Sequence, residues 1–373
     1  MANFRCLGST CEDTCCQGWT IALDEPSYRR LTLLAVERPA AARLLSQGVE
    51  LTPQGPHSVQ LRFSESGRCG MLDESGLCAI HGELGHDFLP EVCASYPRYY
   101  NEVDGQLELF GTLSCPEVAR QCLLGDDVFD IQNIQLDGRP RKLRNRFTTE
   151  APYFKPYLLV RKLLLELLRR ADYTLSEKLF ALLWCCSKVG KVVQVRALEL
   201  PPLQVETTLA GMLGDAVLAD IIDNYRALKL DGALAFSVVS AVVSDNDAAH
   251  NGMTWSEHLN LRERSAGPAL ERGEALVARY CQNYLLTTPY MLFENLFAYA
   301  RNLIRCAAVL RVLIQRRLVG FNGDKDELDA CLVEVVYRFC RRFEHSDTFH
   351  KLDQSLEQQG LNSLAHSVGF LVV

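Results

Sequence analysis

Eight of the fifteen cysteines lie within the first 115 residues of this 373-residue chain. Thiols at this density in a reducing compartment are usually metal ligands rather than disulfide partners. The sequence therefore predicts a metal-binding module in this part of the chain, and the chemistry to consider is that of a thiolate-bound metal. The candidate metal ligands are Cys6, Cys11, Cys15, Cys16, Cys69, Cys78, Cys93 and Cys115.

The spacing of these cysteines bears on which metal they hold. A zinc finger uses paired C-x2-C knuckles, which do not occur here, and adjacent Cys15 and Cys16 cannot both be ideal ligands of one tetrahedral zinc. An iron–sulfur cluster tolerates irregular loops better, because its ligands reach different iron corners. Cys78-x2-His81 offers a mixed thiolate–imidazole alternative, although we expect His81 to be an ordinary polar residue. Eight cysteines could also serve two metal sites.

Four short motifs around these cysteines resemble a known family. They are Phe4-Arg5-Cys6-x4-Cys11-x3-Cys15-Cys16-x2-Trp19, Cys69-Gly70-Met71-Leu72-Asp73 continuing to Leu77-Cys78, Cys93-x2-Tyr96-Pro97-Arg98, and Leu113-Ser114-Cys115-Pro116-Glu117. In them the chain is similar to bacterial flagellin lysine-N-methylases, within a wider group that carries a cysteine-rich iron- or zinc-chelating N-terminal module. Weaker similarity at Arg161-Lys162-Leu163-Leu164 and Asn283-Tyr284-Leu285 extends the resemblance over most of the chain.

The resemblance implies an enzyme that transfers methyl groups from S-adenosylmethionine to lysine side chains of flagellin. It also implies an iron–sulfur cofactor, a [4Fe-4S] cluster, without indicating which four cysteines hold it. The C-x3-C-x2-C pattern of radical S-adenosylmethionine enzymes is begun by Cys11 and Cys15, but Gly18 occupies its third position. A glycine-rich dinucleotide-type loop after a strand is also missing, so the sequence does not place the methyl donor.

Methylation of lysine sets chemical requirements that can be compared with the sequence. The ε-amine has a pKa of about 10.4 and must lose its proton before it attacks the methyl sulfonium. Aromatic faces suit ammonium and methylammonium groups, so Tyr96, Tyr99 and Tyr100 are candidate substrate-binding residues. The alternative is that these rings only pack over the metal module. The acids closest to them in sequence, Glu91, Glu102 and Asp104, are candidate proton acceptors.

A neutral amine is already a nucleophile, so the reaction needs no radical. We therefore favour a structural or donor-binding cluster over a redox one. Two other functions remain open at this point. One is a non-enzymatic metal-binding or metal-delivery protein with a helical interaction platform, and the other is a zinc-stabilised scaffold.

Charge and hydropathy restrict the partners and the compartment. The net charge is −7, which argues against nucleic-acid binding. Residues 1–125 carry nine arginines, no lysine and sixteen acidic residues, and 9 − 16 = −7. This acidity is either a solvated surface or a means of attracting a basic side chain. With no secretory leader and no run of about 18 apolar residues, we expect a cytoplasmic protein without a membrane association.

The fold is predicted to be mainly α, with a small irregular cysteine-rich metal module followed by a helical domain. The expected boundaries are 1–125 for the module, 126–150 for a linker and 151–373 for the helical domain. Asp24-Glu25-Pro26 is typical of a helix start, and 59–63 and 106–113 favour short strands. Capping boxes at Thr174 and Thr254 begin helices. Further helices are expected at 157–170, 207–228, 232–243, 268–286, 290–317 and 325–343, with a buried terminal helix after Gly360. The later cysteines are expected to be core residues.

Overall fold

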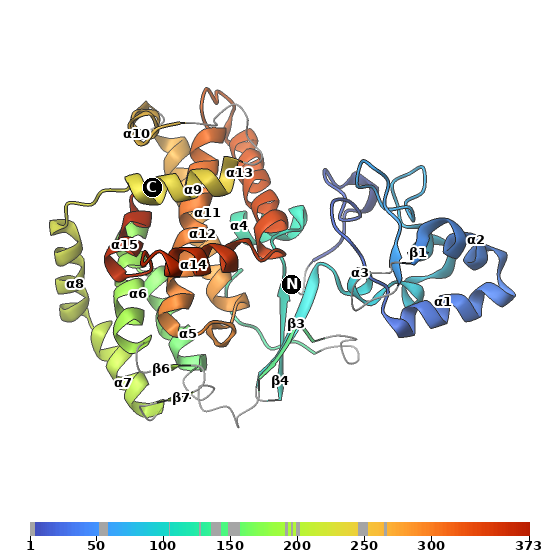
Figure 1. Cartoon of the computed structure of the whole chain (residues 1–373), viewed down its shortest axis with the longest axis horizontal. Helices are drawn as coiled ribbons and strands as arrows, with labels where there is room; N and C mark the ends of the chain where they lie inside the picture. Colours follow the sequence, from blue (N-terminus) through green and yellow to red (C-terminus); the bar gives the residue numbers. More distant parts are fainter. Residues whose placement is uncertain are drawn as a thin grey trace. The chain divides into compact units, whose positions relative to one another are not determined.

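The computed structural model describes residues 4–51, 59–103, 105–126, 128–135, 143–147, 157–190, 193–194, 197–198, 202–244, 253–264 and 267–373. The chain forms two compact units (Figure 1). The N-terminal unit consists of Met1–Val118 and Gln132–Arg146, and the helical unit of Ala119–Ile131 and Phe147–Val373. The predicted linker thus contributes residues to both units. The mainly α class is confirmed.

Short elements joined by loops make up the N-terminal unit. Its helices are α1 (Glu25–Glu37), α2 (Pro39–Gly48), α3 (Glu91–Ser95) and the first turn of α4 (Pro116–Leu124). Its strands are β1 (Val49–Leu51), β2 (Val59–Leu61), β3 (Arg98–Val103), β4 (Gln106–Gly111) and β5 (Asn145–Phe147), the last of which ends one residue inside the helical unit. β1 pairs with β2 in antiparallel register, Val49 opposite Leu61, and a second sheet has the order β4-β3-β5.

The core of the N-terminal unit lies under α1 and α2. Asp24 caps α1 as predicted, because its carboxylate accepts the backbone N–H of Ser27. Leu31 of α1 and Leu44 of α2 then pack against strand and loop residues. This core consists of Ile21, Leu23, Leu31, Ala41, Leu44, Val59, Leu61, Cys69, Met71, Ala79, Ile80, Leu84 and Leu89. Sequence patterning did not predict α2, which is a helix of only ten residues.

The helical unit is built around a central helix, α12, which packs against α6, α9, α11 and α13 (Figure 1). Eighteen of the 22 residues of α12 are buried. The long helices of the unit are α5 (Tyr157–Arg169), α6 (Leu175–Gly190), α7 (Pro202–Met212), α8 (Asp215–Ala227), α9 (Ala233–Ser244), α10 (Trp255–Arg264), α11 (Pro268–Thr287), α12 (Leu296–Arg317), α13 (Lys325–Phe339) and α14 (Thr348–Gln358). The unit also contains a short hairpin, β6 (Val193–Gln194) with β7 (Ala197–Leu198), and the five-residue α15 (Leu364–Val368).

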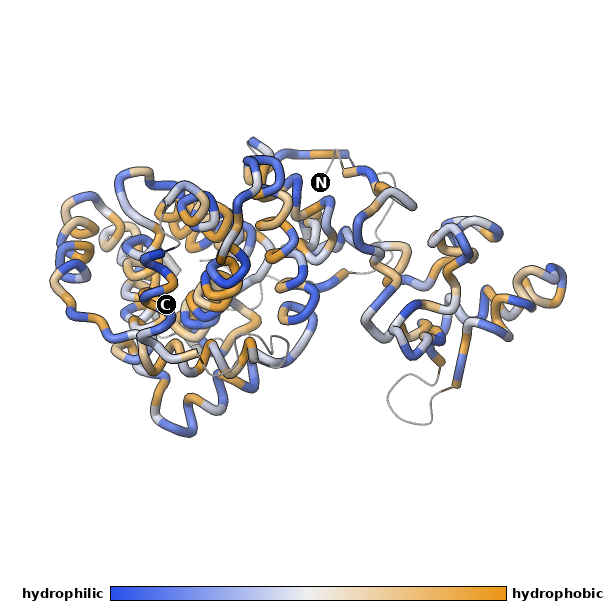
Figure 2. The backbone as a smooth tube through the Cα atoms, turned by 90° about the horizontal axis from the view of Figure 1, so that it is seen from above, coloured by the Kyte–Doolittle hydropathy of each residue, from blue (hydrophilic) through white to orange (hydrophobic). Residues whose placement is uncertain are grey.

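Two of the predicted helices are interrupted in the structure. The helix expected at 207–228 is wrong as one element, because Gly214 has extended backbone angles and separates α7 from α8. The helix expected at 290–317 begins instead at Leu296, where the Asn295 side chain accepts the backbone N–H of Ala298. Both predicted capping boxes are present: Glu177 Oε2 accepts the backbone N–H of Thr174, and Glu257 does the same for Thr254. Among the helices that the structure describes, none is long and apolar enough to cross a membrane. Hydrophobic and hydrophilic stretches alternate along them (Figure 2).

Candidate functional site

All eight predicted metal-ligand cysteines belong to the N-terminal unit, and all are free thiols. Apart from Cys93, they lie on loops or at isolated bridges. Cys69 and Cys115 are buried, Cys6 and Cys15 are exposed, and the remaining four are partly buried. Cys93 is on α3, and Cys115 directly precedes α4. Short, loop-rich elements are what a cluster with irregular ligand spacing requires.

Backbone hydrogen bonds bring distant cysteine segments together. The backbone N–H of Cys69 donates to the carbonyl oxygen of Cys16 at 2.9 Å, which joins the first cysteine loop to the second. Cys78 forms an isolated bridge with Leu72, which folds the loop between Cys69 and Cys78 back on itself. The indole N–H of Trp19 donates to the carbonyl oxygen of Cys15 at 2.7 Å and fixes the turn that carries the adjacent cysteine pair.

The thiols are close enough to affect one another electrostatically. Burial is the main cause that raises the pKa of Cys69, Cys78 and Cys93, and the charge of Cys15 raises all three further. The pKa of Cys16 is raised chiefly by a hydrogen bond with the Cys15 side chain. A like charge disfavours ionisation, whereas a bound cation would favour the thiolate. The charge of a Cys15 thiolate therefore acts on all four of these cysteines.

Two further cysteines extend this group. Burial raises the pKa of Cys115 to about 11, with smaller contributions from the charges of Cys11 and Cys15. Burial also raises the pKa of Cys11, to which Cys6 and Cys15 add. The thiol of Cys11 donates to the carbonyl oxygen of Asp13 at 3.3 Å. The electrostatic influence of Cys15 thus extends to Cys11 and Cys115, and whether the eight cysteines hold one metal site or two stays a prediction.

The chemistry of these side chains bears on whether they can hold a metal. Their type fits, because thiolates are the ligands of iron–sulfur clusters and of structural zinc. Among the described residues, however, no group of three or more histidine, cysteine or acidic side chains is arranged to hold a metal ion. Ligation would therefore require the thiols to come closer together. His81 lies with its ring 6.0 Å from that of His86, and both side chains are exposed.

The three candidate tyrosines do not share one surface. Tyr96 packs against Trp19 with 6.0 Å between ring centres, and its hydroxyl lies 3.3 Å from that of Ser114. Tyr99 and Tyr100 are consecutive on β3, so their side chains point to opposite faces of the sheet. The rings therefore do not form a single aromatic cage, and their role as substrate-binding residues stays a prediction.

One face of Tyr99 already carries a cation. The guanidinium of Arg144 lies 4.5 Å from the centre of this ring, whose neighbour across the sheet is Phe110 at 5.8 Å. The arrangement demonstrates that the ring is accessible to a positively charged group of the chain itself. Of the candidate proton acceptors, Glu102 forms an ion pair with Arg146 at 3.1 Å, and Asp104 lies outside the described residues.

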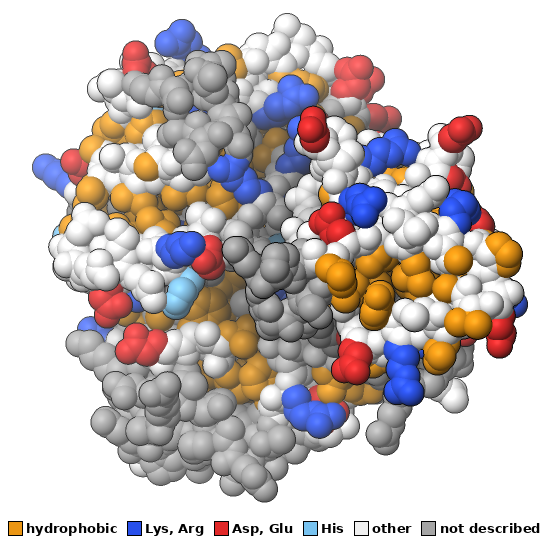
Figure 3. Space-filling view, turned by 45° about the vertical axis from the view of Figure 1, so that its right-hand side comes forward, with side chains coloured by type: hydrophobic (Ala, Val, Ile, Leu, Met, Phe, Trp, Pro, Cys, Tyr) orange, Lys and Arg blue, Asp and Glu red, His pale blue; other side chains and the backbone are white. Residues whose placement is uncertain are grey.

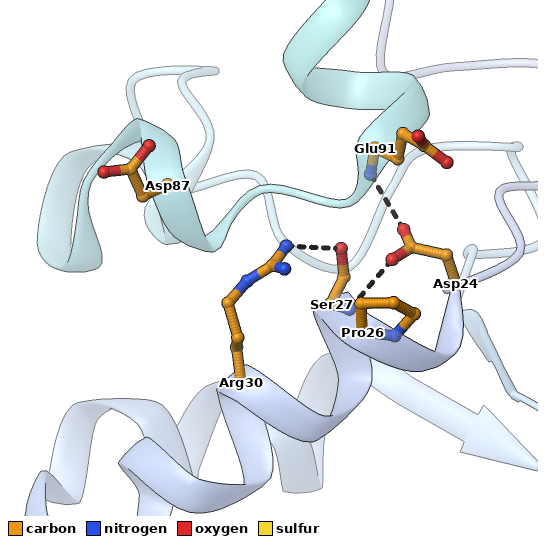
Figure 4. Close-up of a pocket in the computed structure, with 6 residues that line it drawn as sticks. All are labelled: Asp24, Pro26, Ser27, Arg30, Asp87 and Glu91. Atoms are coloured by element: carbon orange, nitrogen blue, oxygen red, sulfur yellow. Dashed lines mark hydrogen bonds between the residues drawn. The ribbon is translucent and has the colours of Figure 1, made fainter. Parts of the chain in front are cut away.

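The third candidate acceptor, Glu91, lines a hollow of about 480 Å³ that the sequence did not predict (Figure 4). The hollow lies at the N-terminal end of α1 and is lined by Asp24, Pro26, Ser27, Arg30, Asp87 and Glu91. The sequence signal at Asp24-Glu25-Pro26 identified the start of α1. It could not indicate that Asp87 and Glu91, more than sixty residues later, lie beside it.

The later cysteines occupy the core of the helical unit. Cys185, Cys186, Cys281, Cys306 and Cys340 are each at most 3% exposed, and Cys331 is 7% exposed. Their pKa values are raised by burial. The prediction that they are core residues is confirmed.

Comparison with known proteins assigns the family. The family model described as the FliB lysine N-methylase C-terminal domain matches residues 161–370. The chain belongs to the FliB lysine N-methylase family. It is 28% identical to proteins named lysine-N-methylase from Salmonella choleraesuis and Salmonella typhimurium, over 94% of this chain and 92% of each relative. It is also 31% identical to the flagellar biosynthetic protein FliU of Salmonella muenchen, over 41% of this chain and 90% of that protein.

Family membership confirms the predicted enzyme class, a protein-lysine N-methyltransferase, and decides against the non-enzymatic metal-delivery alternative. The matched region, 161–370, lies in the helical unit, whereas the cysteine motifs lie in the N-terminal unit. The relatives align over both units. No solved structure matches this chain.

Proposed function

We propose that this chain transfers methyl groups from S-adenosylmethionine to lysine side chains of flagellin, and that the cysteines of its N-terminal unit hold a [4Fe-4S] cluster. Membership of the FliB lysine N-methylase family supports the transfer of methyl groups to lysine. The flagellar substrate is supported by the name of the FliU relative, a flagellar biosynthetic protein. The enzyme would act on flagellin monomers in the cytoplasm.

The chemistry is a displacement at carbon. The lysine Nζ loses a proton to a base, and its lone pair then attacks the methyl group of the sulfonium. The carbon–sulfur bond breaks, and its electron pair stays on sulfur, which leaves as neutral S-adenosylhomocysteine. The protein must desolvate the ammonium or place an acceptor beside it, because the free amine is a minor species at pH 7. Carboxylates and tyrosines of the N-terminal unit supply groups of this kind.

The cluster ligands are proposed to be one of the adjacent pair Cys15 and Cys16 together with Cys69, Cys78 and Cys93. The charges of these residues act on one another, and the hydrogen bond from Cys69 to Cys16 already joins their loops. Mutual repulsion of the thiolates is what binding of iron would relieve. The cluster, when bound, would supply a covalent tie among these loops.

Anaerobic purification followed by iron, sulfide and zinc analysis tests the cofactor. The expected protein is brown, absorbs broadly near 400 nm, bleaches on reduction and contains about four irons per chain. Colourless protein with about one zinc per chain would overturn the cluster and support a zinc-stabilised module.

Activity is tested separately from the cofactor. Purified flagellin monomers and S-adenosylmethionine are incubated with the chain, and the mass of flagellin is followed. Increments of one methyl group on lysine-containing peptides are expected. Methylation of other proteins without methylation of flagellin would overturn the substrate while leaving the enzyme class intact.

A further inference from the structure

We propose that the outer face of α1 and the hollow at its N-terminal end form a docking surface for the protein substrate, which accepts a basic side chain flanked by apolar ones. This surface is called the α1 surface below and consists of Arg30, Leu33, Val36, Asp87 and Glu91. The inference rests on the proposed function, because it concerns how the same enzyme holds its protein substrate.

The apolar part of the surface is unusual for a helix that already has a buried face. Leu31 of α1 is 1% exposed and belongs to the core, yet Leu33 is 62% exposed and Val36 is 85% exposed. Residues three apart lie next to each other on a helix, so these two side chains form one exposed stripe. Hydrophobic side chains gather on the part of the surface where Figure 1 draws α1 and α2 (Figure 3). Adjacent exposed apolar residues on a charged helix are typical of an interaction site.

The charged part adjoins this stripe. A second hollow, of about 430 Å³, is lined by Glu25, Pro26, Arg29, Arg30 and Leu33, and it shares Pro26 and Arg30 with the first. The stripe therefore continues into the hollow that holds Asp87 and Glu91. The guanidinium of Arg30 donates to the hydroxyl of Ser27, one turn earlier on α1, at 2.8 Å (Figure 4).

Carboxylates and one guanidinium line this hollow. Within the described part of the chain, Glu91 makes no ion pair, and the buried Nε of Arg30 has no hydrogen-bond partner. Asp87 has an exposed carboxylate, 4.0 Å from the ring of His86. Two carboxylates beside a guanidinium can bind a lysine or arginine side chain together with a neighbouring backbone carbonyl.

Charge and shape favour a basic protein segment as the occupant. Residues 1–125 carry a net charge of −7 and contain no lysine, so they attract basic groups and offer the enzyme none of its own lysines there. A second copy of the chain would bring the same carboxylates against one another in a two-fold contact. Free S-adenosylmethionine would use the hollow but leave the Leu33 and Val36 stripe uncovered.

Binding of flagellin monomers, measured without donor by biolayer interferometry, tests the surface. The variants are Glu91→Gln and the double change Leu33→Ser with Val36→Ser. Matched controls are Glu74→Gln, an exposed acid, and Leu51→Ser, which is 75% exposed on β1 of the same unit. We expect about tenfold weaker binding and a similarly raised KM for flagellin in both variants, with the controls within twofold of the unaltered chain.

Each other result counts against the surface. Unchanged binding in both variants, with flagellin still methylated, would overturn the surface and leave the proposed function standing. A raised KM for S-adenosylmethionine alone would make the hollow a donor site, and a changed sedimentation coefficient would make the stripe a contact between copies. An unaltered chain that neither binds nor methylates flagellin would overturn the proposed function itself.

Discussion

The carboxylate of Asp24 accepts the backbone N–H of Glu91, sixty-seven residues further along the chain, at 3.0 Å. Its other oxygen accepts the backbone N–H of Ser27 at 2.8 Å. One side chain therefore caps α1 and holds the first residue of α3, the helix that carries Cys93. A local capping residue has acquired a long-range role in placing a proposed cluster ligand.

Replacement of Asp24 by alanine is expected to destabilise the N-terminal unit by about 1–2 kcal/mol, because two partly buried N–H donors lose their acceptor. Hydrogen exchange of the Ser27 and Glu91 amides should accelerate, whereas amides of α12 should not change. Asp24→Asn keeps an acceptor oxygen and should recover most of the loss. If both amides exchange as slowly in the alanine variant as in the unaltered chain, Asp24 does not have this role.

The pKa of Asp24 predicts how this stability depends on pH. Burial raises the pKa, but the hydrogen bonds from Glu91 and Ser27 outweigh it, and the pKa lies below its usual value. The ionised form is thus favoured by folding, so the contribution is present above the unfolded pKa of about 3.9 and is lost as the pH falls through the folded pKa. Acid titration of the Glu91 amide exchange rate should detect this loss.

Cysteine substitutions should distinguish the proposed cluster ligands of the N-terminal unit from the core cysteines of the helical unit. Cys69→Ser or Cys93→Ser is expected to lower bound iron to a small fraction of that in the unaltered chain, because each removes a proposed ligand. Cys331→Ser, in the helical unit, should retain the full amount. Iron analysis and the absorption near 400 nm report the result. Full iron content in both N-terminal variants would exclude them as ligands.

His258 should make the helical unit sensitive to mild acid. Its ring is 1% exposed and stacks on Phe236, with 4.4 Å between ring centres, and on Trp255 at 5.4 Å. Burial, together with the charges of Arg262 and Arg316, lowers its pKa to about 4. Folding therefore favours the neutral ring, and stability is present above pH 6.5 and is lost as the pH falls toward 4.

The expected loss between pH 6.5 and 4 is on the order of 2–3 kcal/mol. Urea unfolding of the unaltered chain and of His258→Phe would measure it, because the phenylalanine variant should lack this part of the pH dependence. His350→Gln, at an exposed position on α14, serves as the control. Parallel pH profiles for the unaltered chain and His258→Phe would contradict the assignment.

A buried ion pair fastens α14 to the central helix. The Arg305 side chain is 2% exposed and donates to Asp353, which also pairs with Arg301 at 3.2 Å. Asp353→Ala leaves the buried Arg305 charge without its partner and should cost about 3–5 kcal/mol. Asp347→Ala breaks an exposed pair with Lys351 and should cost far less, because solvent screens such a pair. Thermal unfolding would distinguish them, and equal losses would show that Asp353 has no special role.

Sequence reasoning predicted the parts of this fold that local signals specify. The cap at Asp24 and the capping boxes at Thr174 and Thr254 depend on residues within one helical turn of each other. The helical class of the second unit depends on the spacing of apolar residues along single helices. It failed where a helix was interrupted by backbone geometry, as at Gly214. There the apolar pattern continued through the break, and periodicity alone could not locate it.

The candidate site was predictable in composition but not in arrangement. The cysteine spacing identified the module and the eight thiols that share it. Which thiols approach one another is set by contacts between loops far apart in sequence, such as that between Cys16 and Cys69. The same holds for the hollow beside α1, because nothing near Arg30 in the sequence indicates Asp87. The tyrosines were adjacent in sequence, yet strand geometry separates Tyr99 from Tyr100.

The division of the chain between the two units has a consequence for synthesis on the ribosome. β3 is paired with β4 on one edge and with β5 on the other, and β5 begins only at Asn145, after residues 119–131 of the helical unit. A nascent or truncated chain that ends near residue 125 would carry all eight N-terminal thiols but expose an unpaired strand edge, which invites aggregation. Fragments intended to isolate the cysteine-rich unit should therefore extend through Phe147, and the proposed cluster would have a complete host only after that point of translation.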